Sequence, residues 1–378
     1  MPRPILYLLF LTLIFTACHQ REQQTFVSLK VYKEYDSTRN FDTTSKSKNI
    51  YRPVRIDVFY PSTEKPLQAS LTYGNLVDMY EQRFNYNTPI DACKKTSLDM
   101  ATAFAGYFHV DAATKFLQYK TGINENLSFP QKQYPLVIYA ASMNGSSWEN
   151  AVLFDSLASH GYIVAAVSSV GKFPGFMSDA VDVNEQVQDI LYTIQFMKNL
   201  PFIDGDDIGI ASWSMGGTSA AKAAMLTKEI KCMLSFDGTD IHAYGDDTAW
   251  DREYNQIRAI PPYSPQSIDI PYMYLRSEHP KKVDSIYNTQ ALASSKDKYF
   301  LKFANAIHED FSSLPVVAKQ VQPSIPGVRT KYYGDISKLT LLFFDEYLKK
   351  EGDKNVGAYI DQLVTSDTAH YSSVGPKY

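Results

Sequence analysis

The amino-acid sequence predicts an α/β protein with a mostly parallel central sheet and helices on both faces of that sheet. From residue 130 to residue 350, short apolar segments typical of buried strands alternate with longer segments typical of helices. One of these strands, residues 207–212, runs directly into a turn rich in serine and glycine and then into an alanine-rich helix. The chain of 378 residues is long enough for one large domain of this class with insertions.

The first residues of the chain have the proportions of a signal peptide. Arg3 precedes an unbroken apolar run over residues 5–15, which is too short to span a bilayer. We therefore expect residues 1–17 to be a secretory signal peptide.

The end of this run resembles the lipobox of bacterial lipoproteins, because two small residues, Thr16 and Ala17, precede Cys18. Phe15 departs from that pattern, in which leucine is commoner. The resemblance implies lipid attachment at Cys18 and a protein of the bacterial cell envelope, lipid-anchored and facing the periplasm or the exterior. Residues 18–49 would then be the lipidated cysteine and a tether. The alternative is a plain secretory signal followed by an incidental cysteine.

The main domain is expected over residues 50–350. Residues 50–60 alternate between polar and apolar side chains, which is typical of an edge strand with one buried face. Residues 63–130 carry mixed signals, with helices expected at 76–84 and 98–108. We interpret them as an insertion that covers part of the domain.

After Pro130 the alternation of strands and helices becomes regular. Buried strands are expected at residues 134–140, 162–168, 207–212, 232–236, 272–276 and 299–303. Helices are expected at residues 148–160, 182–200, 218–226, 281–294 and 336–349. Residues 351–378 are polar and are expected to be a C-terminal extension.

The composition and the short motifs exclude several classes of function. The chain is 44% hydrophobic and 21% charged, with a net charge of −4 and no basic stripe, so nucleic acid is not expected as a partner. No C-x-x-C or H-E-x-x-H pattern is present, so no structural or catalytic zinc is indicated. We expect neither a metal nor a cofactor. Cys93 and Cys232 could pair in an oxidising compartment, but their spacing does not support it, and Cys232 lies in an apolar strand typical of a buried free thiol.

The segment Ser-Trp-Ser-Met-Gly-Gly carries the strongest functional signal. Its strand–turn–helix context is that of a nucleophile elbow, with Ser214 at the tip. So tight a turn needs small residues two positions before and two positions after the nucleophile. Gly216 meets this demand, and Ser212 stands where the usual motif has glycine. A bare serine–x–glycine occurs by chance, so the hypothesis depends on the flanking strand, the second glycine and the helix.

Two further residues would complete a catalytic triad with Ser214, because a serine hydroxyl needs a base and a carboxylate to orient that base. In the α/β-hydrolase fold the order along the chain is serine, acid, histidine, each on a loop after a strand. His308 follows the last expected strand and precedes acidic and aromatic residues, so it is the preferred base. Asp237, directly after a strand, is the preferred acid, and Glu278, after the next strand, is the alternative.

An oxyanion hole requires two backbone N–H donors. One is expected from Met215, the residue after the nucleophile. The other is expected from the loop after the strand at 134–140, and we assign it to Ser142. Many proteins of the α/β-hydrolase fold have His-Gly at this point, whereas this chain has Ala140-Ala141.

With these residues placed, the chain resembles the platelet-activating-factor acetylhydrolase and dienelactone-hydrolase-like branch of the α/β-hydrolases. The matching segments are residues 52–61, 134–139, 157–167, the turn around Ser214, Phe236-Asp237 and residues 307–311. The short interval from Ser214 to Asp237 matches the acetylhydrolase pattern, and residues 63–130 match weakly. The resemblance implies metal-independent hydrolysis of carboxylic esters with short or modified acyl chains, through an acyl-enzyme formed by Ser214, Asp237 and His308.

The substrate expected from this resemblance is a small-molecule or lipid-like ester, with the membrane contacted only through the N-terminal lipid anchor. Fold does not dictate substrate, so a peptidase or a carbohydrate esterase on the same scaffold stays open. Outside enzymes, the alternative is a non-catalytic surface lipoprotein that binds glycans or partners. The intact order of serine, acid and histidine argues against that alternative.

Overall fold

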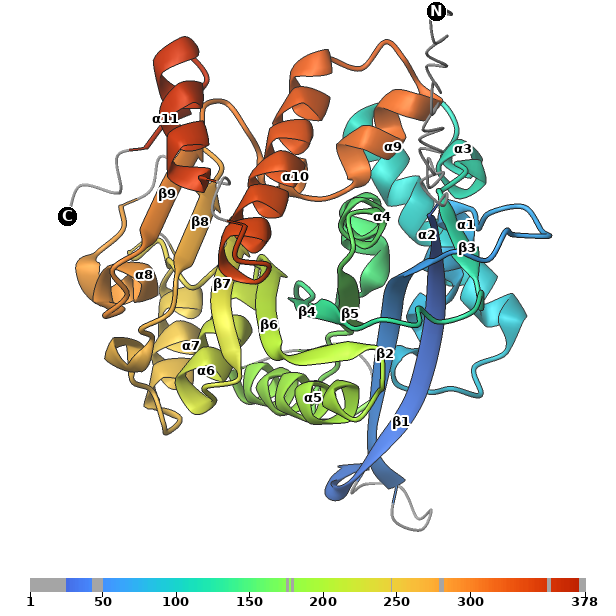
Figure 1. Ribbon diagram of the computed structural model, residues 1–378, viewed down its shortest axis with the longest axis horizontal. Coiled ribbons are helices and arrows are strands. Elements are labelled where there is room, and N and C mark those ends of the chain that lie inside the picture. The colour runs from blue at the N-terminus through green and yellow to red at the C-terminus, as the bar shows by residue number, and fades with distance from the viewer. Residues whose placement is uncertain are drawn as a thin grey trace, which may run out of the picture.

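The computed structural model describes residues 25–42, 50–174, 177, 180–245, 247–278, 282–351 and 355–373. Within them it confirms the predicted α/β architecture, a central sheet with helices on both faces (Figure 1). The strand order is β10-β9-β8-β7-β6-β4-β5-β2-β1-β3. The strands are Phe26–Asp42 (β1), Ile50–Ser62 (β2), Ile123–Glu125 (β3), Tyr134–Ala140 (β4), Ile163–Val167 (β5), Ile203–Trp213 (β6), Ile230–Phe236 (β7), Tyr272–Arg276 (β8), Lys298–Phe303 (β9) and Tyr371–Ser372 (β10).

The centre of the sheet is parallel, as expected. The six neighbouring strands β5, β4, β6, β7, β8 and β9 are parallel to one another. In contrast, β2 runs antiparallel to both β1 and β5, and β10 runs antiparallel to β9. The carboxyl ends of parallel strands meet at one edge of the sheet. The loops after β4, β6, β7 and β9 therefore come together there.

The helices form two layers on the sheet (Figure 1). The α-helices are Tyr73–Asp78 (α1), Ile90–Phe108 (α2), Ala113–Gln118 (α3), Ala151–Ser159 (α4), Ala180–Lys198 (α5), Gly216–Leu226 (α6), Thr248–Ala259 (α7), Thr289–Leu292 (α8), Leu314–Val321 (α9), Gly327–Tyr347 (α10) and Val356–Ser366 (α11). The 3-10 helices are Tyr80–Arg83 (η1), Ser147–Asn150 (η2), Pro265–Ser267 (η3), Ser285–Tyr287 (η4) and His308–Phe311 (η5).

Alternating side chains of the strands fill a separate apolar core on each face of the sheet. On β4, Val137 and Tyr139 join the core that α4, α9 and α10 cover, and Leu136 and Ile138 join the core that α5 and α6 cover. This period of two is the physical reason why a strand buried on both faces reads as a continuous apolar run.

The segment at 63–130 forms α1, η1, α2, α3 and β3. Tyr73 and Leu76 of α1 and Phe116 of α3 are fully buried in the same core as α4 and α9. The segment therefore covers one face of the sheet, and β3 adds a parallel edge strand beside β1.

The expectation of a tether over residues 18–49 is wrong for residues 26–42, which form β1 and pair with β2 along its length. Val27 and Leu29 are buried in the core, so the strand is anchored by alternate apolar side chains despite its polar composition. As a consequence β2 lies between β1 and β5, and the expected edge strand at 50–60 is an inner strand. The signal peptide and Cys18 lie outside the described residues.

The domain also continues past residue 350. Helix α11 buries Val356, Ile360 and Leu363 against the core, and Tyr371 of β10 pairs with Phe303 of β9. Residues 355–373 are therefore part of the domain and not an appended extension. A further correction concerns the helix expected at residues 281–294, because the described part of it, residues 282–294, contains η4 and the four-residue α8 in place of one helix.

Cys93 and Cys232 are both buried and free, so they do not pair in this structure.

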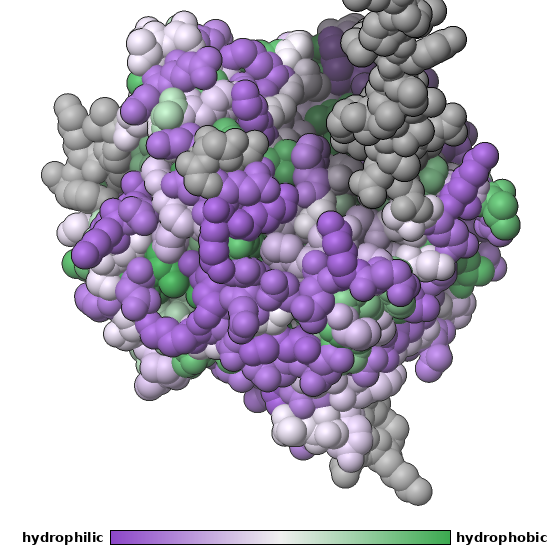
Figure 2. All heavy atoms as spheres, viewed as in Figure 1, coloured by the Kyte–Doolittle hydropathy of each residue, from purple (hydrophilic) through white to green (hydrophobic). Residues whose placement is uncertain are grey.

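Among the described residues, no helix combines the length and the apolar character that crossing a membrane requires. The face of the molecule drawn in Figure 2 is dominated by hydrophilic residues, with hydrophobic ones in small separate groups.

Candidate active site

Ser214 lies on a tight turn between β6 and α6. Its φ of +57° is in the left-handed region that residues with a side chain rarely adopt. A Cβ atom on residue 216 would overlap the carbonyl oxygen of Ala140 and lie 2.7 Å from that of Ala141, so only glycine fits there. Ser212 is fully buried, and its hydroxyl donates to the carbonyl oxygen of Leu234 at 3.3 Å. The turn thus accommodates serine where the usual motif has glycine.

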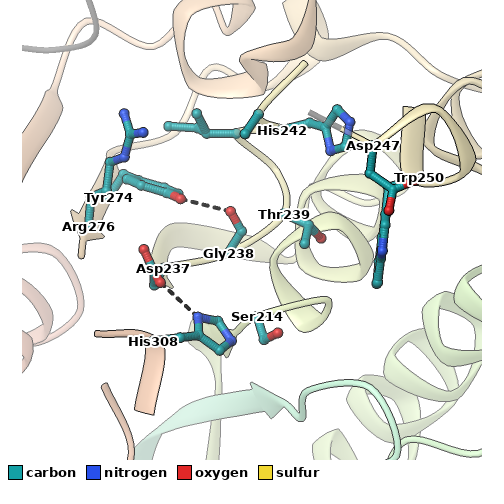
Figure 3. A pocket seen from close by; sticks show the side chains of 12 residues that line it. Ser214, Asp237, Gly238, Thr239, His242, Asp247, Trp250, Tyr274, Arg276 and His308 are labelled. Atoms are coloured by element: carbon teal, nitrogen blue, oxygen red, sulfur yellow. Dashed lines mark hydrogen bonds and ion pairs between the residues drawn. The ribbon is translucent and has the colours of Figure 1, made fainter. Parts of the chain in front are cut away.

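Asp237 and His308 meet beside Ser214. Asp237 follows β7 directly, and His308 begins η5 in the loop after β9. The Nδ1 atom of His308 lies 2.7 Å from Oδ2 of Asp237, and Ser214 lies on the opposite side of the imidazole ring (Figure 3). The structure therefore brings together the three residues selected from the sequence.

Electrostatics reinforce the pairing of Asp237 and His308. Burial raises the pKa of Asp237, but the hydrogen bond and charge of His308 and the hydrogen bonds from Ser277 outweigh it, so this pKa lies below its ordinary value. Burial lowers the pKa of His308, but the hydrogen bond and charge of Asp237, together with the charges of Glu309 and Glu149, raise it overall. Both shifts favour a carboxylate beside a protonated imidazole.

Two neighbours of this pair escaped the reasoning from sequence. The N–H and the hydroxyl of Ser277 both donate to Oδ1 of Asp237 at 2.9 Å, which orients the carboxylate. The indole ring of Trp213 stacks on the His308 ring with centroids 5.1 Å apart, and its Nε1 donates to the carbonyl oxygen of His308 at 3.3 Å. Their positions at the carboxyl ends of β8 and β6 were the only signal in the sequence.

Glu278, the alternative acid, does not contact His308. Its carboxylate accepts from Nζ of Lys302 at 3.1 Å and from the N–H of Asn305 at 2.7 Å, and its side chain is 41% exposed. The hydrogen bonds from Asn305 and Lys302 hold its pKa below the ordinary value. Between the two candidate acids, the geometry favours Asp237.

The two expected oxyanion donors have different surroundings. Met215 precedes the first residue of α6, where N–H groups lack partners within the helix. The N–H of Ser142, in contrast, donates to Oε2 of Glu149 at 3.1 Å. The assignment of Ser142 therefore needs correction, because its N–H already has a buried acceptor. The next residue, Met143, packs its side chain in the same apolar cluster as Met215.

The pocket at Ser214 is a cavity of about 280 Å³ with polar and aromatic walls. Asp237 and His308 lie near Ser214 on one side, and Asp247 and Trp250 lie across from them, at the start of α7 (Figure 3). Trp250 is 47% exposed, which is unusual for so large an apolar side chain.

A second, smaller hollow adjoins this pocket and shares with it Thr239, His242 and Trp250. Its remaining walls are mostly apolar and include Met143, Val183, Met215, Tyr254 and Ile257. It contains about 20 Å³ of free space. Among the described residues, no three His, Cys, Asp or Glu side chains gather in a way that could hold a metal ion.

A family model and a protein relative are similar to parts of this chain. The model described as "BAAT / Acyl-CoA thioester hydrolase C terminal" matches residues 192–318, which contain Ser214, Asp237 and His308. Dipeptidyl peptidase 8 of Mus musculus is 25% identical over 178 residues, which are 41% of this chain and 20% of that protein. The chain thus spans only about a fifth of the length of that relative.

A solved structure is similar over nearly the whole chain. It is described as a ferulic acid esterase from Streptomyces cinnamoneus, with a TM-score of 0.60 and 17% sequence identity, and the match covers 89% of this chain and 93% of that one. Identity this low speaks for the fold alone. Together with the parallel sheet and the serine turn, it establishes that this chain has an α/β-hydrolase fold.

Proposed function

We propose that this protein is a serine hydrolase that cleaves carboxylic esters through an acyl-enzyme. The single observation that carries the proposal is the 2.7 Å hydrogen bond between His308 and Asp237, with Ser214 at a strained turn on the other side of the imidazole. Strain of this kind is retained where function needs it. The finer assignment to the acetylhydrolase and dienelactone-hydrolase-like branch belongs to the same proposal.

In the proposed reaction His308 removes the proton from the Ser214 hydroxyl as Oγ bonds to the ester carbon. The protonated imidazole, stabilised by Asp237, then gives that proton to the leaving alkoxide as the ester C–O bond breaks. Water attacks the acyl-enzyme with His308 again as base, which releases the acid and restores Ser214. The N–H groups of Met215 and Met143 are the proposed donors to the oxyanion.

The two hollows support an ester with one small half. The apolar hollow borders Met143 and Met215, and its free space of about 20 Å³ exceeds only slightly the 10–15 Å³ that a single water needs. We therefore propose an acyl group about the size of acetyl, with a larger polar or aromatic alcohol in the open pocket beside Trp250. On this proposal a long acyl chain would not fit the small hollow.

Labelling and hydrolysis test the proposal together. A fluorophosphonate should modify Ser214 and leave Ser212 unmodified, and p-nitrophenyl acetate should be hydrolysed without added metal. The rate should fall from acetate to butyrate to octanoate. Feruloyl esters, acyl-CoA thioesters and dipeptide anilides test the activities named for the similar proteins. A folded protein that neither labels nor hydrolyses any of these substrates would leave the non-catalytic binding lipoprotein as the better reading.

We also propose that the protein is lipid-anchored at the bacterial cell envelope through Cys18, on the basis of the apolar run and the small residues before that cysteine. The variant Cys18→Ser should then be released into the soluble fraction, whereas the wild type should partition with membranes and carry a lipid-modified N-terminus. Recovery of the wild type wholly in the soluble fraction without that modification would refute the proposal.

A further inference from the structure

We propose that Glu149 is a positioning residue that holds the oxyanion loop, residues 141–145, against the loop that carries His308. This inference rests on the proposed function, because it assigns a role within the same site. Glu149 was not singled out from the sequence, where it appears as an ordinary residue near the start of an expected helix.

The Glu149 carboxylate is fully buried and accepts three hydrogen bonds from the strand and loop beside it. Oε2 accepts from the N–H of Ser142 at 3.1 Å and from the hydroxyl of Tyr139 at 3.2 Å, and Oε1 accepts from the hydroxyl of Ser142. A Cβ atom on residue 145 would overlap the same carboxylate, so Gly145 lets the loop close over it. One side chain thus bonds to Ser142 near the start of the oxyanion loop and lies against Gly145 at its end.

The backbone of Glu149 and the neighbouring Asn150 connect this loop to the segment after His308. The N–H of Ser313 donates to the carbonyl oxygen of Glu149 at 2.7 Å. The side-chain amide of Asn150 donates to the hydroxyl of Tyr139 at 2.8 Å and to the carbonyl oxygen of Phe311 at 3.3 Å. Buried hydrogen bonds therefore join Ser142 of the oxyanion loop to Phe311 and Ser313, which end and follow the short helix that His308 begins, and such sets hold geometry within narrow limits.

The ionisable groups that face Glu149 come from four elements. They are Tyr139 on β4, Tyr73 on α1, Tyr80 in η1 and His308 in η5. Burial raises the pKa of Glu149 to about 7, although the hydrogen bonds from Ser142 and Tyr139 and the charge of His308 oppose that rise. Conversely, the charge of Glu149 helps to raise the pKa of His308.

A carboxylate suits this position because it only accepts hydrogen bonds, and it meets two N–H or O–H donors on one oxygen and one on the other. Glutamine can still present an oxygen to the N–H of Ser142, but it lacks the charge. Leucine keeps a similar volume and presents no acceptor, which leaves that N–H without its buried partner. These two substitutions therefore separate the anchoring of the loop from the charge near His308.

The experiment measures kcat and KM for p-nitrophenyl acetate across pH in Glu149→Leu and Glu149→Gln. In Glu149→Leu, kcat should fall by about 10- to 100-fold with KM changed by less than about threefold, because a displaced oxyanion donor weakens transition-state binding only. In Glu149→Gln, kcat at high pH should stay within about fivefold of the wild type. Its acid limb should move to lower pH, because loss of the negative charge lowers the pKa of His308.

Glu309→Gln is the matched control. The charge of Glu309 also raises the pKa of His308, but its carboxylate accepts from Tyr107 and lies outside the oxyanion loop. It should move the acid limb in the same direction and leave kcat at high pH unchanged. A folded Glu149→Leu with wild-type kcat would overturn the proposal. If that variant does not fold, Ser142→Ala takes its place, because it removes the hydroxyl that donates to Oε1 of Glu149 and should also lower kcat. Wild-type kcat in Ser142→Ala would then overturn the proposal.

Hydrogen exchange separates this inference from the proposed function. If the wild type neither labels nor hydrolyses esters, the proposed function fails, and the anchoring of the loop can still be measured. Amide exchange over residues 141–145 should then be faster in Glu149→Leu than in the wild type, relative to the β4 amides. Equal exchange rates would refute the anchoring.

Discussion

Replacing Asp237 with asparagine should nearly abolish turnover while leaving the fold intact. The carboxylate accepts from Nδ1 of His308 at 2.7 Å and from the N–H and hydroxyl of Ser277 at 2.9 Å. An asparagine that keeps its oxygen toward Ser277 must turn its amide N–H groups toward Nδ1. The imidazole then carries its proton on Nε2 and cannot accept the proton of Ser214.

The magnitude follows from this change of tautomer. A wrong tautomer at the base of a triad lowers kcat by about 10⁴-fold, which corresponds to about 5 kcal/mol of transition-state stabilisation. We expect Asp237→Asn to show this loss in kcat for p-nitrophenyl acetate, with little change in KM and an unchanged circular dichroism spectrum.

Glu278→Gln is the matched control, since it changes another carboxylate one strand away. Its exposed ion pair with Lys302 contributes at most about 1 kcal/mol to stability and nothing to the orientation of His308. Its activity should stay within about twofold of the wild type. If Asp237→Asn keeps more than a tenth of the activity while Glu278→Gln loses it, the assignment of the acid is wrong.

Three further predictions follow from the geometry. Gly216→Ala should lower the free energy of unfolding by about 1–3 kcal/mol and slow fluorophosphonate labelling, because the added Cβ overlaps the carbonyl oxygen of Ala140. A wild-type melting temperature together with wild-type labelling kinetics would argue against so tight a turn. The pKa of Glu149 is about 7 in the folded protein against 4.5 ordinarily, so its contribution to stability is fully present below pH 4.5 and is lost as the pH rises through 7. In denaturant titrations, the free energy of unfolding of Glu149→Gln should therefore rise by about 3 kcal/mol relative to that of the wild type between these pH values. A difference that does not change with pH would contradict the raised pKa. Trp250→Ala should raise KM for aryl esters about fivefold in steady-state assays, because stacking on an exposed ring contributes about 1 kcal/mol, and Trp250→Phe should stay near the wild type. Equal KM values for Trp250→Ala and the wild type would remove Trp250 from the substrate site.

Local patterns in the sequence were sufficient for the parallel centre of the sheet. Strands buried on both faces read as continuous apolar runs, and β4, β7 and β8 begin and end within a few residues of where those runs do. The strand β1 was missed because it is rich in charged residues and buries only alternate side chains. Its assignment depends on pairing with β2, which a local pattern does not reveal.

Ser214, Asp237 and His308 could be selected from the sequence because each follows a strand, and the topology of a parallel sheet brings the ends of its strands together. The choice between Asp237 and Glu278 was different, since both carboxylates satisfy that rule. It depends on which of them the turn aims at the imidazole, and the φ of +45° at Asp237 is a property of the folded turn.

The sequence by itself determined the fold class, the serine turn and the small set of residues from which a triad could be built. Those features depend on local periodicity, on the size of residues in one tight turn and on order along the chain. Only the tertiary structure decided three further features. Strands β1 and β10 complete the sheet, Asp237 rather than Glu278 contacts His308, and Glu149 accepts a hydrogen bond from the N–H of Ser142. The first two outcomes depend on pairing between residues far apart in the chain. The third depends on burial, because a buried carboxylate is stable only where folding has gathered the donors that replace water.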